Sequence, residues 1–333
     1  MTLPACEHAA FLAEALRSPS PHNAQPWRLV ATANSSYELH YDHLQYLPHD
    51  PDDRDAYLTL GAFYETAALV ARRHGLVCSF EPVFERTGSD LFAGVLRVDD
   101  TPSDLEPDPL SDAVLERVTN RRKYRRRPLP PELALELARN GCTFVEPRVI
   151  ASVVRRASVL SWTDRQFVAD LRRWTRFGDR NAPDGMTPHA LALSRLETVA
   201  LRFALLRTRL SRPVAHVYAH RDVTLTHASS TIAVLAADSM DPVDLFEAGR
   251  RLLRAWTTAT AAGYSTHPIS VVIDRPETRP ELAAIAGVRL PVALFRVGYT
   301  RRRVPWSNRR LLHTVLGAGG RPGAQVPGLL PWR

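Results

Sequence analysis

The stretch Ser18–Trp27 reads SPSPHNAQPW, and the interpretation of the whole chain starts from it. It follows a helix-like segment that ends at Arg17, and it combines three prolines with an Asn, a Gln and a Trp. Proline restricts the backbone and lowers the conformational entropy that is lost when a loop is held rigid. A simple connection needs only some of these residues. We therefore expect a loop that holds its own backbone still against a flat ligand.

Composition places the chain among soluble globular proteins. Hydrophobic residues make up 45% of the 333 positions and charged residues 23%, and no window is long and apolar enough to span a bilayer. This length allows one large domain or two smaller ones. The N-terminal segment carries Glu7 and Glu14 and predicts a helix, not a signal peptide. Cys6, Cys78 and Cys142 are few and far apart, which predicts reduced thiols and a cytoplasmic protein without a disulfide framework.

The net charge of +8 raises the question of a nucleic-acid partner. Lys123 is the only lysine, and the arginines mix with Asp and Glu along most of the chain. Two clusters remain, at 120–127 (NRRKYRRR) and at 300–310 (TRRRVPWSNRR). Guanidinium groups pair with phosphate oxygens, so these clusters suit a bound phosphate, although a solvated surface is the simpler alternative. We expect a small-molecule partner, no nucleic acid and no membrane, with nucleic-acid binding as a weaker alternative.

Apolar periodicity divides the chain into two regions of similar helix–strand rhythm, which indicates an α+β or α/β class. In the first region we expect strands at 27–32, 37–42, 76–84 and 92–98 and a helix at 54–75. The acidic, proline-rich stretch at 99–112 is typical of a linker. In the second region we expect helices at 111–119 (with Ser111 as N-cap), 130–141, 152–176 and 242–263, and buried strands at 230–238 and 290–299.

The segment 177–226 interrupts this rhythm. It contains GDRNAPDGMTPH and returns to a helical pattern only near LETVALRFALLRTRL. Long irregular segments inside compact domains are often lids. We therefore expect an insertion that covers something.

Several common chemistries lack their sequence patterns here. There is no glycine-rich phosphate loop, no GxSxG elbow and no HExxH motif. His216 and His220 have helical spacing and His227 follows, but such a pair without a close third ligand is more often incidental, so we expect no metal. The acidic run HDPDDRD at 49–55 is expected to cap the following helix, not to hold a cation.

Four segments carry a resemblance to a known family. SPSPHNAQPW resembles the Pro-Ser-x-x-Asn-x-Gln-Pro-Trp segment of the FMN-dependent nitroreductases. ERVTNRRKY (116–124) resembles the Arg-x-Ser-x-Arg/Lys element of that family, and AGYSTHPIS (262–270) resembles its Gly and Pro beside the flavin. GYTRRRVPWSNRR resembles its C-terminal Gly-Tyr strand end followed by Pro-x-Ser-x-Arg. The order and length are most similar to the Acg-type branch, in which one chain contains two nitroreductase-like halves.

The resemblance implies an α+β, nitroreductase-like fold with antiparallel or mixed sheets and long helices. Ordinary nitroreductases are homodimers with FMN at the subunit interface. Here residues 1–105 would form the first half, and residues 106–333 the second half with the phosphate site and a lid at about 177–226. One chain would thus be an internal pseudo-dimer that binds one FMN, either as a monomer or as a further homodimer.

The resemblance also implies the binding residues. Arg121 would reach the pyrimidine edge of the flavin and raise its reduction potential, and the amide of Ser270 would donate toward N5. Asn23 and Gln25 could instead bond only loop backbone, Pro268 could be an ordinary turn proline, and Arg310 could lie on the surface. The expected FMN contacts are the wall Pro19, Ser20, Pro21 and Asn23, the phosphate ligands Arg117, Thr119, Ser307, Arg309 and Arg310, and the ring contacts Arg121, Pro268, Ile269 and Ser270.

The function implied is that of an FMN-dependent oxidoreductase. NADH or NADPH would be the reductant, and two-electron hydride transfer through flavin N5 would reduce a small acceptor. The alternative is a protein that stores or sequesters FMN beneath a closed lid with little turnover. Departures from the family pattern at Ser270, Val271, Tyr124, Trp306 and Asn308 affect the fine geometry of the site.

Overall fold

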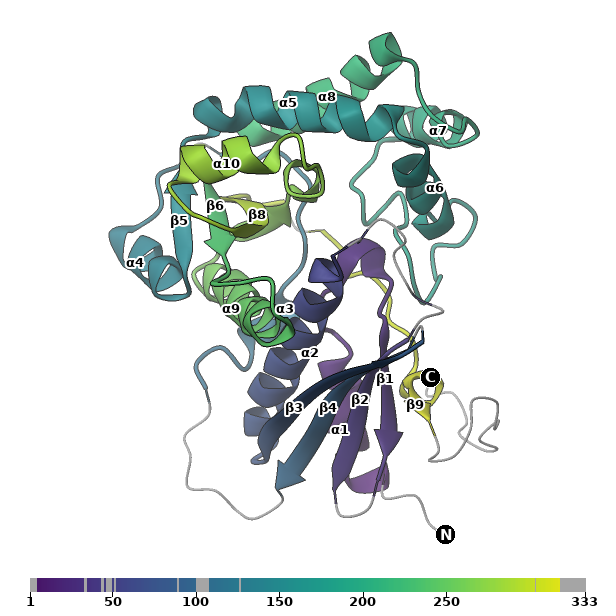
Figure 1. The fold of residues 1–333 in the computed structure, drawn as a ribbon, viewed down its shortest axis with the longest axis vertical. Helices are drawn as coiled ribbons and strands as arrows, with labels where there is room; N and C mark the ends of the chain where they lie inside the picture. The colour runs from purple at the N-terminus through teal and green to yellow at the C-terminus, as the bar shows by residue number, and fades with distance from the viewer. Residues whose placement is uncertain are drawn as a thin grey trace.

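Two β-sheets with a pair of long helices between them organise the chain (Figure 1). The fold is that of a computed structural model, which describes residues 5–32, 35–42, 45, 50, 52–88, 90–99, 108–125, 127–302 and 304–317. The α+β class with antiparallel and mixed sheets and long helices agrees with the expectation from the sequence. Within the described residues, none of the helices combines the length and the apolar character that a bilayer-spanning segment requires.

The first sheet is built mainly from the N-terminal region and has the strand order β3-β4-β2-β1-β9. Its neighbours pair antiparallel, except that the short C-terminal strand β9 runs parallel to β1. The elements of this region are α1 (Ala5–Ala15), β1 (Trp27–Ala31), β2 (Ser36–Tyr41), α2 (Arg54–Arg73), β3 (Val77–Thr87), β4 (Asp90–Asp99) and, from the end of the chain, α11 (Leu312–Val315) and β9 (Leu316–Gly317).

The second sheet has the order β5-β6-β8-β7, and all its neighbours are antiparallel. Figure 1 shows α5, α8 and α10 over the face of this sheet that is turned away from the first sheet. The elements of this region are α3 (Ala113–Glu116), α4 (Pro131–Arg139), β5 (Cys142–Val145), α5 (Pro147–Thr163), α6 (Arg165–Trp174), α7 (Arg195–Ala204), α8 (Arg212–His227), β6 (Thr231–Ala236), α9 (Pro242–Ala261), β7 (Ser265–Pro268), α10 (Arg279–Ala286) and β8 (Pro291–Gly298).

The two regions repeat one topology. The order β3-β4-β2-β1 in the first sheet corresponds to β7-β8-β6-β5 in the second, with the same antiparallel pairs. In each region a helix of 20 residues, α2 or α9, follows the second strand of the set. The regions differ most after the first strand, where the short β1–β2 connection corresponds to the long excursion α5–α8.

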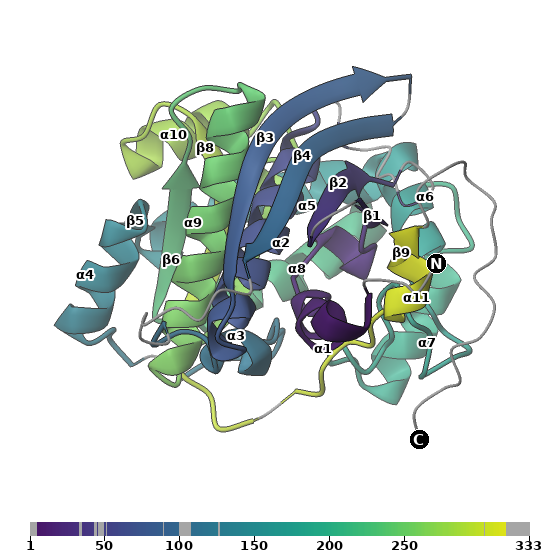
Figure 2. The same cartoon turned by 90° about the horizontal axis from the view of Figure 1, so that it is seen from below.

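The helices α2 and α9 pack side by side between the sheets (Figure 2). Two glycines allow the close approach: a Cβ atom on Gly61 would overlap the carbonyl of Phe246, and one on Gly249 would overlap the carbonyl of Leu58. The contact is reciprocal, because each glycine lies three residues after the carbonyl that the other glycine meets. Reciprocal contacts of this kind characterise two-fold interfaces.

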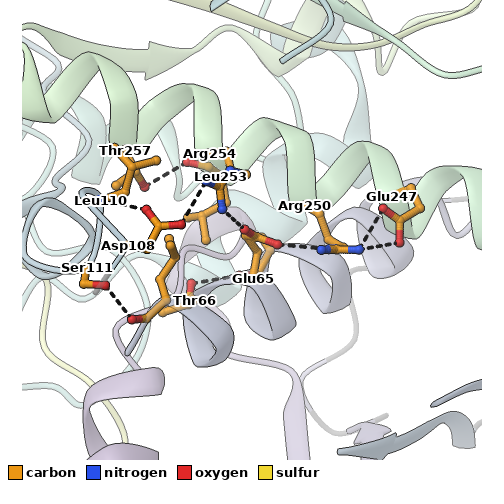
Figure 3. A network of polar contacts seen from close by, with 12 residues as sticks. Glu65, Thr66, Asp108, Leu110, Ser111, Glu247, Arg250, Leu253, Arg254 and Thr257 are labelled. Atoms are coloured by element: carbon orange, nitrogen blue, oxygen red, sulfur yellow. Dashed lines mark hydrogen bonds and ion pairs between the residues drawn. The ribbon is translucent and has the colours of Figure 1, made fainter. Parts of the chain in front are cut away.

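A charged network also joins these helices (Figure 3). The buried carboxylate of Glu65 on α2 accepts from Arg250 Nε at 2.9 Å and from Arg254 Nη1 at 2.6 Å, both on α9. Arg254 Nη2 continues the network to Asp108 at 3.0 Å. Because Asp108 opens the second region, the network connects both regions at the point where the chain passes from one to the other.

The expected helix at 111–119 is wrong in its extent. Only the single turn α3 is helical, and Arg117 is already extended, with φ −60° and ψ 125°. Thr119 then pairs in parallel with Thr266 on β7. The β-branched residues Val118 and Thr119 favour extended backbone, and this pairing outweighs the helical pattern of the residues before them.

The expected N-cap role of Ser111 is also wrong. Asp112 occupies the N-cap position of α3, and the Ser111 hydroxyl donates to the carbonyl of Leu69 on α2. A hydroxyl bonds the acceptor that tertiary packing brings nearest, which local sequence does not reveal. The linker expected at 99–112 and the boundary expected at 105/106 lie largely outside the described residues.

The long helix expected at 152–176 is two helices, α5 and α6. Asp164 separates them and caps α6, because its carboxylate accepts from the amides of Gln166 at 2.7 Å and Phe167 at 3.2 Å. An aspartate can serve either as an interior helix residue or as an N-cap, and here the cap prevails. The remaining long helices and strands occur where the periodicity predicted them.

The acidic run before α2 caps that helix, as expected. Asp50 accepts from the amide of Ala56 in the first turn at 3.0 Å. Arg54 is buried and donates to Asp55 and Asp274, so it pairs with carboxylates other than Asp50. No group of three or more metal-ligating side chains occurs among the described residues.

Candidate functional site

A pocket lies where the Ser18–Trp27 loop meets the beginning and the end of the second region. It contains about 600 Å³ of empty space, part of which is open solvent. Four separate segments line it: Arg17, Pro19, Ser20 and Asn23; Arg117, Val118, Thr119 and Arg121; Met186 and Ala190; and Pro305, Trp306, Ser307 and Arg309. Eight of the thirteen expected binding residues are therefore brought together.

The loop has an unusual backbone. His22, Asn23 and Gln25 have positive φ values of 51°, 58° and 53°. Residues other than glycine rarely adopt this left-handed region, and it persists only where the surroundings enforce it. The backbone amide of Gln25 donates to the Ser20 hydroxyl at 2.9 Å, which closes the loop on itself. These features are consistent with the rigid loop that the sequence predicts.

Two amide side chains of this loop bind the segments around it. Asn23 Nδ2 donates to the carbonyls of Gly185 and Asn308, both at 3.1 Å, while the Gly185 amide donates to Asn23 O at 3.1 Å. Gln25 Nε2 donates to Pro183 O at 2.8 Å, and its Oε1 accepts from the amide of Arg310 at 2.8 Å. The two amides thus fasten the 177–193 segment and the C-terminal segment to the loop.

The 177–193 segment covers this side of the molecule. Met186 and Ala190 contribute to the pocket lining, and Asn308 Nδ2 holds the segment through the carbonyls of Arg180 and Ala182. By contrast, α8 packs against α5 and contributes Val223 to the core beneath the second sheet. Within the expected insertion at 177–226, α8 thus belongs to the packed core of the second region.

Arg117 is the most informative residue in the pocket. It is buried, and within the described part of the chain its Nε and Nη1 atoms find no hydrogen-bond acceptor. Burial, and next the nearby charge of Arg17, lower its pKa to about 10. The guanidinium still carries its charge at neutral pH, so the shift expresses the cost of holding a desolvated cation without an anion. An anionic ligand would satisfy both its charge and its unpaired donors.

Arg121 lies on the same extended segment. Burial, together with the charges of Arg221 and Arg296, lowers its pKa to about 10. Its Nη1 donates to Ala190 O of the covering segment at 3.2 Å, so the side chain links the pocket to its cover. Neither Arg117 nor Arg121 forms an ion pair with a carboxylate of the described residues.

Arg309 has a different environment although it lines the same pocket. Burial, and then the charges of Arg117 and Arg17, lower its pKa to about 9. Its Nε donates to Leu16 O at 2.9 Å and its Nη2 to Arg17 O at 3.0 Å, while its Nη1 donates to Asn23 Oδ1 at 2.9 Å. These contacts hold the end of α1 and the Ser18–Trp27 loop in place, and they leave few donors for a ligand.

A buried arginine supports the segment that carries Arg117 and Arg121. Arg296 on β8 is fully buried and donates through Nη2 to the carbonyls of Asn120 at 3.2 Å and Arg122 at 3.0 Å. Its Nε donates to His267 Nδ1 at 2.9 Å, and burial lowers the pKa of His267 well below its usual value, which keeps that nitrogen an acceptor. Arg296 therefore positions the segment that carries Arg117 and Arg121, and it is not among the residues that line the pocket.

The other expected residues are not among those that line the pocket. Pro268 ends β7, Ile269 packs in the core beside α5, and Ser270 is exposed. Pro21 is not among the pocket-lining residues, and neither is Arg310, whose Nη1 lies 3.6 Å from the carboxylate of Asp42.

Six lining residues were not among the expected contacts: Arg17, Val118, Met186, Ala190, Pro305 and Trp306. Arg17 stacks over the exposed Trp306 ring at 4.3 Å from its centroid, so the two form one side of the pocket. Arg17 directly precedes the Ser18–Trp27 loop, and Met186 lies within the DGMTP stretch of the covering segment, so both had a signal in the sequence. Ala190 had none.

Comparison with known proteins adds to this picture. No family model matches the chain. A Mycobacterium tuberculosis protein named "Putative NAD(P)H nitroreductase Rv3131" is 26% identical over 303 residues, which span 86% of this chain and 83% of that protein. Another from the same organism, named "Putative NAD(P)H nitroreductase acg", is 26% identical over 301 residues, or 85% of this chain and 86% of that protein. These similarities confirm the resemblance to the nitroreductase family and its Acg-type branch.

Proposed function

We propose that the protein is an FMN-dependent oxidoreductase of nitroreductase type that takes electrons from NADH or NADPH and reduces a small acceptor. The observation that carries the proposal is Arg117, a buried cation with unpaired donors at a pocket that also contains Arg121. The names of the similar proteins support the same activity. A buried charge is normally compensated by a charge of opposite sign, so the uncompensated Arg117 indicates a site for an anion that binds and dissociates.

The residues present fit FMN. Arg117, Thr119 and Ser307 would hold the phosphate, because guanidinium and hydroxyl groups bond phosphate oxygens well. Pro19, Ser20 and Asn23 would form one wall of the site. Arg309 would act mainly by restraining the loop, since its donors already bond backbone carbonyls and Asn23.

When bound, FMN would supply two-electron hydride transfer at N5. The chain would set the conditions for that chemistry. Arg121 would place a positive charge beside the pyrimidine edge, and Pro268, Ile269 and Ser270 would border the ring from the β7 side. Met186 and Ala190 would limit water and ligand access from the covering segment.

We further propose that the two halves, 1–105 and 106–333, form an internal pseudo-dimer with one FMN between them. The repeated strand order and the reciprocal contacts of Gly61 and Gly249 support this. The pocket draws on the loop of the first half and on the Arg117–Arg121 segment of the second. In the second half α4 is followed directly by β5, without a counterpart of the Ser18–Trp27 loop, which supports a single site.

A second candidate function is FMN storage beneath a closed cover. The observation in its favour is that the covering segment is held at Asn23, Gln25 and Arg121, so hydride donors would need it to move. Nicotinamide must approach N5 to roughly 3–3.5 Å for transfer, and even partial cover would prevent this.

Visible absorption tests both candidates. The purified protein should show a flavin spectrum, or gain one when FMN is added and excess is removed. Colourless protein that takes up no FMN would reject the cofactor and both functions. Rapid anaerobic bleaching by NADH or NADPH would establish the reductase and eliminate pure storage, whereas bleaching by dithionite alone would favour storage.

A further inference from the structure

The outer face of α7 and of the neighbouring part of α8 exposes large apolar side chains. Leu196, Val199 and Phe203 follow one side of α7, and Leu206 continues it beyond the helix. We call these residues, together with Val214 and Val217 on α8, the α7–α8 patch. Its members are between 43% and 79% exposed. Single exposed apolar residues are ordinary, but a cluster of this kind marks an interaction surface.

The patch is not needed to fold α7. The other side of this helix buries Ala204 and partly buries Leu201 in a separate apolar cluster with Trp162 and Val168. The hydroxyl of Tyr218 on α8 donates to Ala200 O at 3.0 Å, which joins the two helices. The exposed stripe is therefore additional to the core contacts.

Five arginines lie within three residues of a patch member along the chain. All five are exposed, and none forms an ion pair with a described residue: Arg195, Arg202, Arg207, Arg209 and Arg212. Glu197, the acidic residue of α7, is already engaged as a capping-box partner of Ser194 and lies 3.6 Å from Arg221. The surface thus combines an apolar stripe with uncompensated positive charge.

We propose that the α7–α8 patch docks on an anionic lipid surface. Helices that lie in the bilayer interface carry Phe and Leu on one side and Lys or Arg beside them, with low overall hydrophobicity. The apolar side chains would enter the headgroup boundary, and the arginines would reach lipid phosphates, as long cationic side chains commonly do. Figure 1 shows α7 and α8 at the end of the molecule farthest from α1.

A second copy of the chain is a poorer occupant. The whole chain carries a net charge of +8, and a symmetric contact through the patch would bring the unpaired arginines of both copies together. An anionic bilayer supplies the missing negative charge along the whole face. The expectation of no membrane partner rested on the absence of a spanning segment, and peripheral docking does not require one.

Vesicle co-sedimentation of the full chain tests the proposal. We expect at least about tenfold stronger association with vesicles that contain about one third phosphatidylglycerol than with pure phosphatidylcholine, and loss of association near 0.5 M salt, as screening requires. The double substitutions Phe203→Ser with Leu206→Ser and Arg202→Glu with Arg209→Glu should each weaken association about tenfold or more. Leu135→Ser on α4, which is also exposed, is the matched control and should change nothing.

A separate readout does not depend on the stability of these variants. Phe203→Trp places a reporter in the patch, and its emission should shift to the blue on mixing with the anionic vesicles. Three outcomes would overturn the proposal: no association of the wild-type protein with anionic vesicles, association that the Phe203 and Leu206 changes leave intact, or a concentration-dependent dimer that the same changes abolish. The last outcome would assign the patch to a second copy of this chain.

Discussion

Two of the regions that bury charged side chains do so with opposite results. Between α2 and α9, Glu65 is buried but shared by Arg250 and Arg254, and each of these arginines has a further carboxylate, Glu247 or Asp108. In the pocket, Arg117 is buried with unpaired donors, and the charge of another arginine, Arg17, lowers its pKa further. In the first region the buried carboxylate has cationic partners, whereas in the second the buried cation has no anionic partner among the described residues.

This difference separates folding from binding. A fully paired buried network adds little net stability over apolar packing, yet it costs much to break, because each remaining charge stays desolvated. An unpaired buried cation lowers the stability of the ligand-free fold and returns that free energy when an anion binds. The two regions should therefore respond in opposite ways to the removal of charge.

The largest effect is expected in the charged network between α2 and α9. Glu65→Ala should lower the free energy of unfolding by about 2–3 kcal/mol, because two arginines lose charge-assisted hydrogen bonds. Urea denaturation followed by circular dichroism measures this. The control is Glu81→Ala, since Glu81 pairs with Arg97 where the two side chains are 64% and 57% exposed, and such a pair contributes at most about 1 kcal/mol. Equal losses in both variants would remove the distinction between the regions.

The opposite response is expected in the pocket. Arg117→Leu should leave the unfolding free energy of FMN-free protein unchanged or raise it by about 1 kcal/mol, because a desolvated charge disappears. The same change should weaken FMN binding by about 1.5–3 kcal/mol, the value of lost charged hydrogen bonds, and should affect riboflavin much less.

Calorimetric titration with both flavins provides the measurement, and Arg139→Leu on the exposed face of α4 is the control. A loss of stability in FMN-free Arg117→Leu would mean that Arg117 has a structural role. An equal loss of affinity for FMN and riboflavin would mean that it does not face the phosphate.

The sequence predicted features that depend on local interactions better than features that depend on contacts between distant residues. The rigid loop, α2, α9 and the central strands follow from local periodicity and turn residues, and the motif residues Asn23, Arg117 and Arg121 do reach one pocket. The end of α3 and the break at Asp164 were missed. The end of α3 depends on the pairing of Thr119 with Thr266, which is a tertiary contact. The break at Asp164 depends on this residue acting as an N-cap instead of continuing the helix.

The roles inside the pocket were harder to predict than its members. Nothing in the sequence distinguishes Arg309, which donates to backbone carbonyls, from Arg117, which keeps unpaired donors. Likewise, the support that Arg296 gives to the 120–122 segment depends on a contact across 174 residues of sequence. Burial and hydrogen-bond geometry decide these roles, and both appear only after folding.

Asp50 is the acidic counterpart of Arg117. It is a buried acid, and the neighbouring cation donates its hydrogen bonds to other carboxylates. Arg54 donates to Asp55 and Asp274, and burial, followed by the charge of Asp55, raises the pKa of Asp50 to about 7. The folded state therefore holds a proton that the unfolded state releases near pH 4, so this contribution to stability is complete below about pH 4 and is lost as pH rises through 7.

Asp50→Asn should remove that dependence. Between pH 5 and 8 the wild-type protein should lose about 2.5 kcal/mol relative to the variant, measured by urea denaturation across the range. Parallel stability profiles for the two proteins would show that Asp50 is ionised in the folded state and is adequately compensated by Arg54.

The smallest effect concerns the cover and asks whether the pocket can open. Asn23 holds the 177–193 segment through Gly185, and loss of these hydrogen bonds should destabilise the closed position by about 1 kcal/mol. In Asn23→Ala, amide exchange at residues 182–190 should therefore accelerate about fivefold, while exchange in α2 and α9 stays unchanged. Asn140→Ala on α4 removes a comparable side-chain-to-carbonyl bond far from the pocket and should leave the segment as protected as in the wild type. If the protein is a reductase gated by this segment, anaerobic bleaching by NADPH should accelerate in the same variant; faster exchange without faster bleaching would show that opening of the cover does not limit hydride transfer.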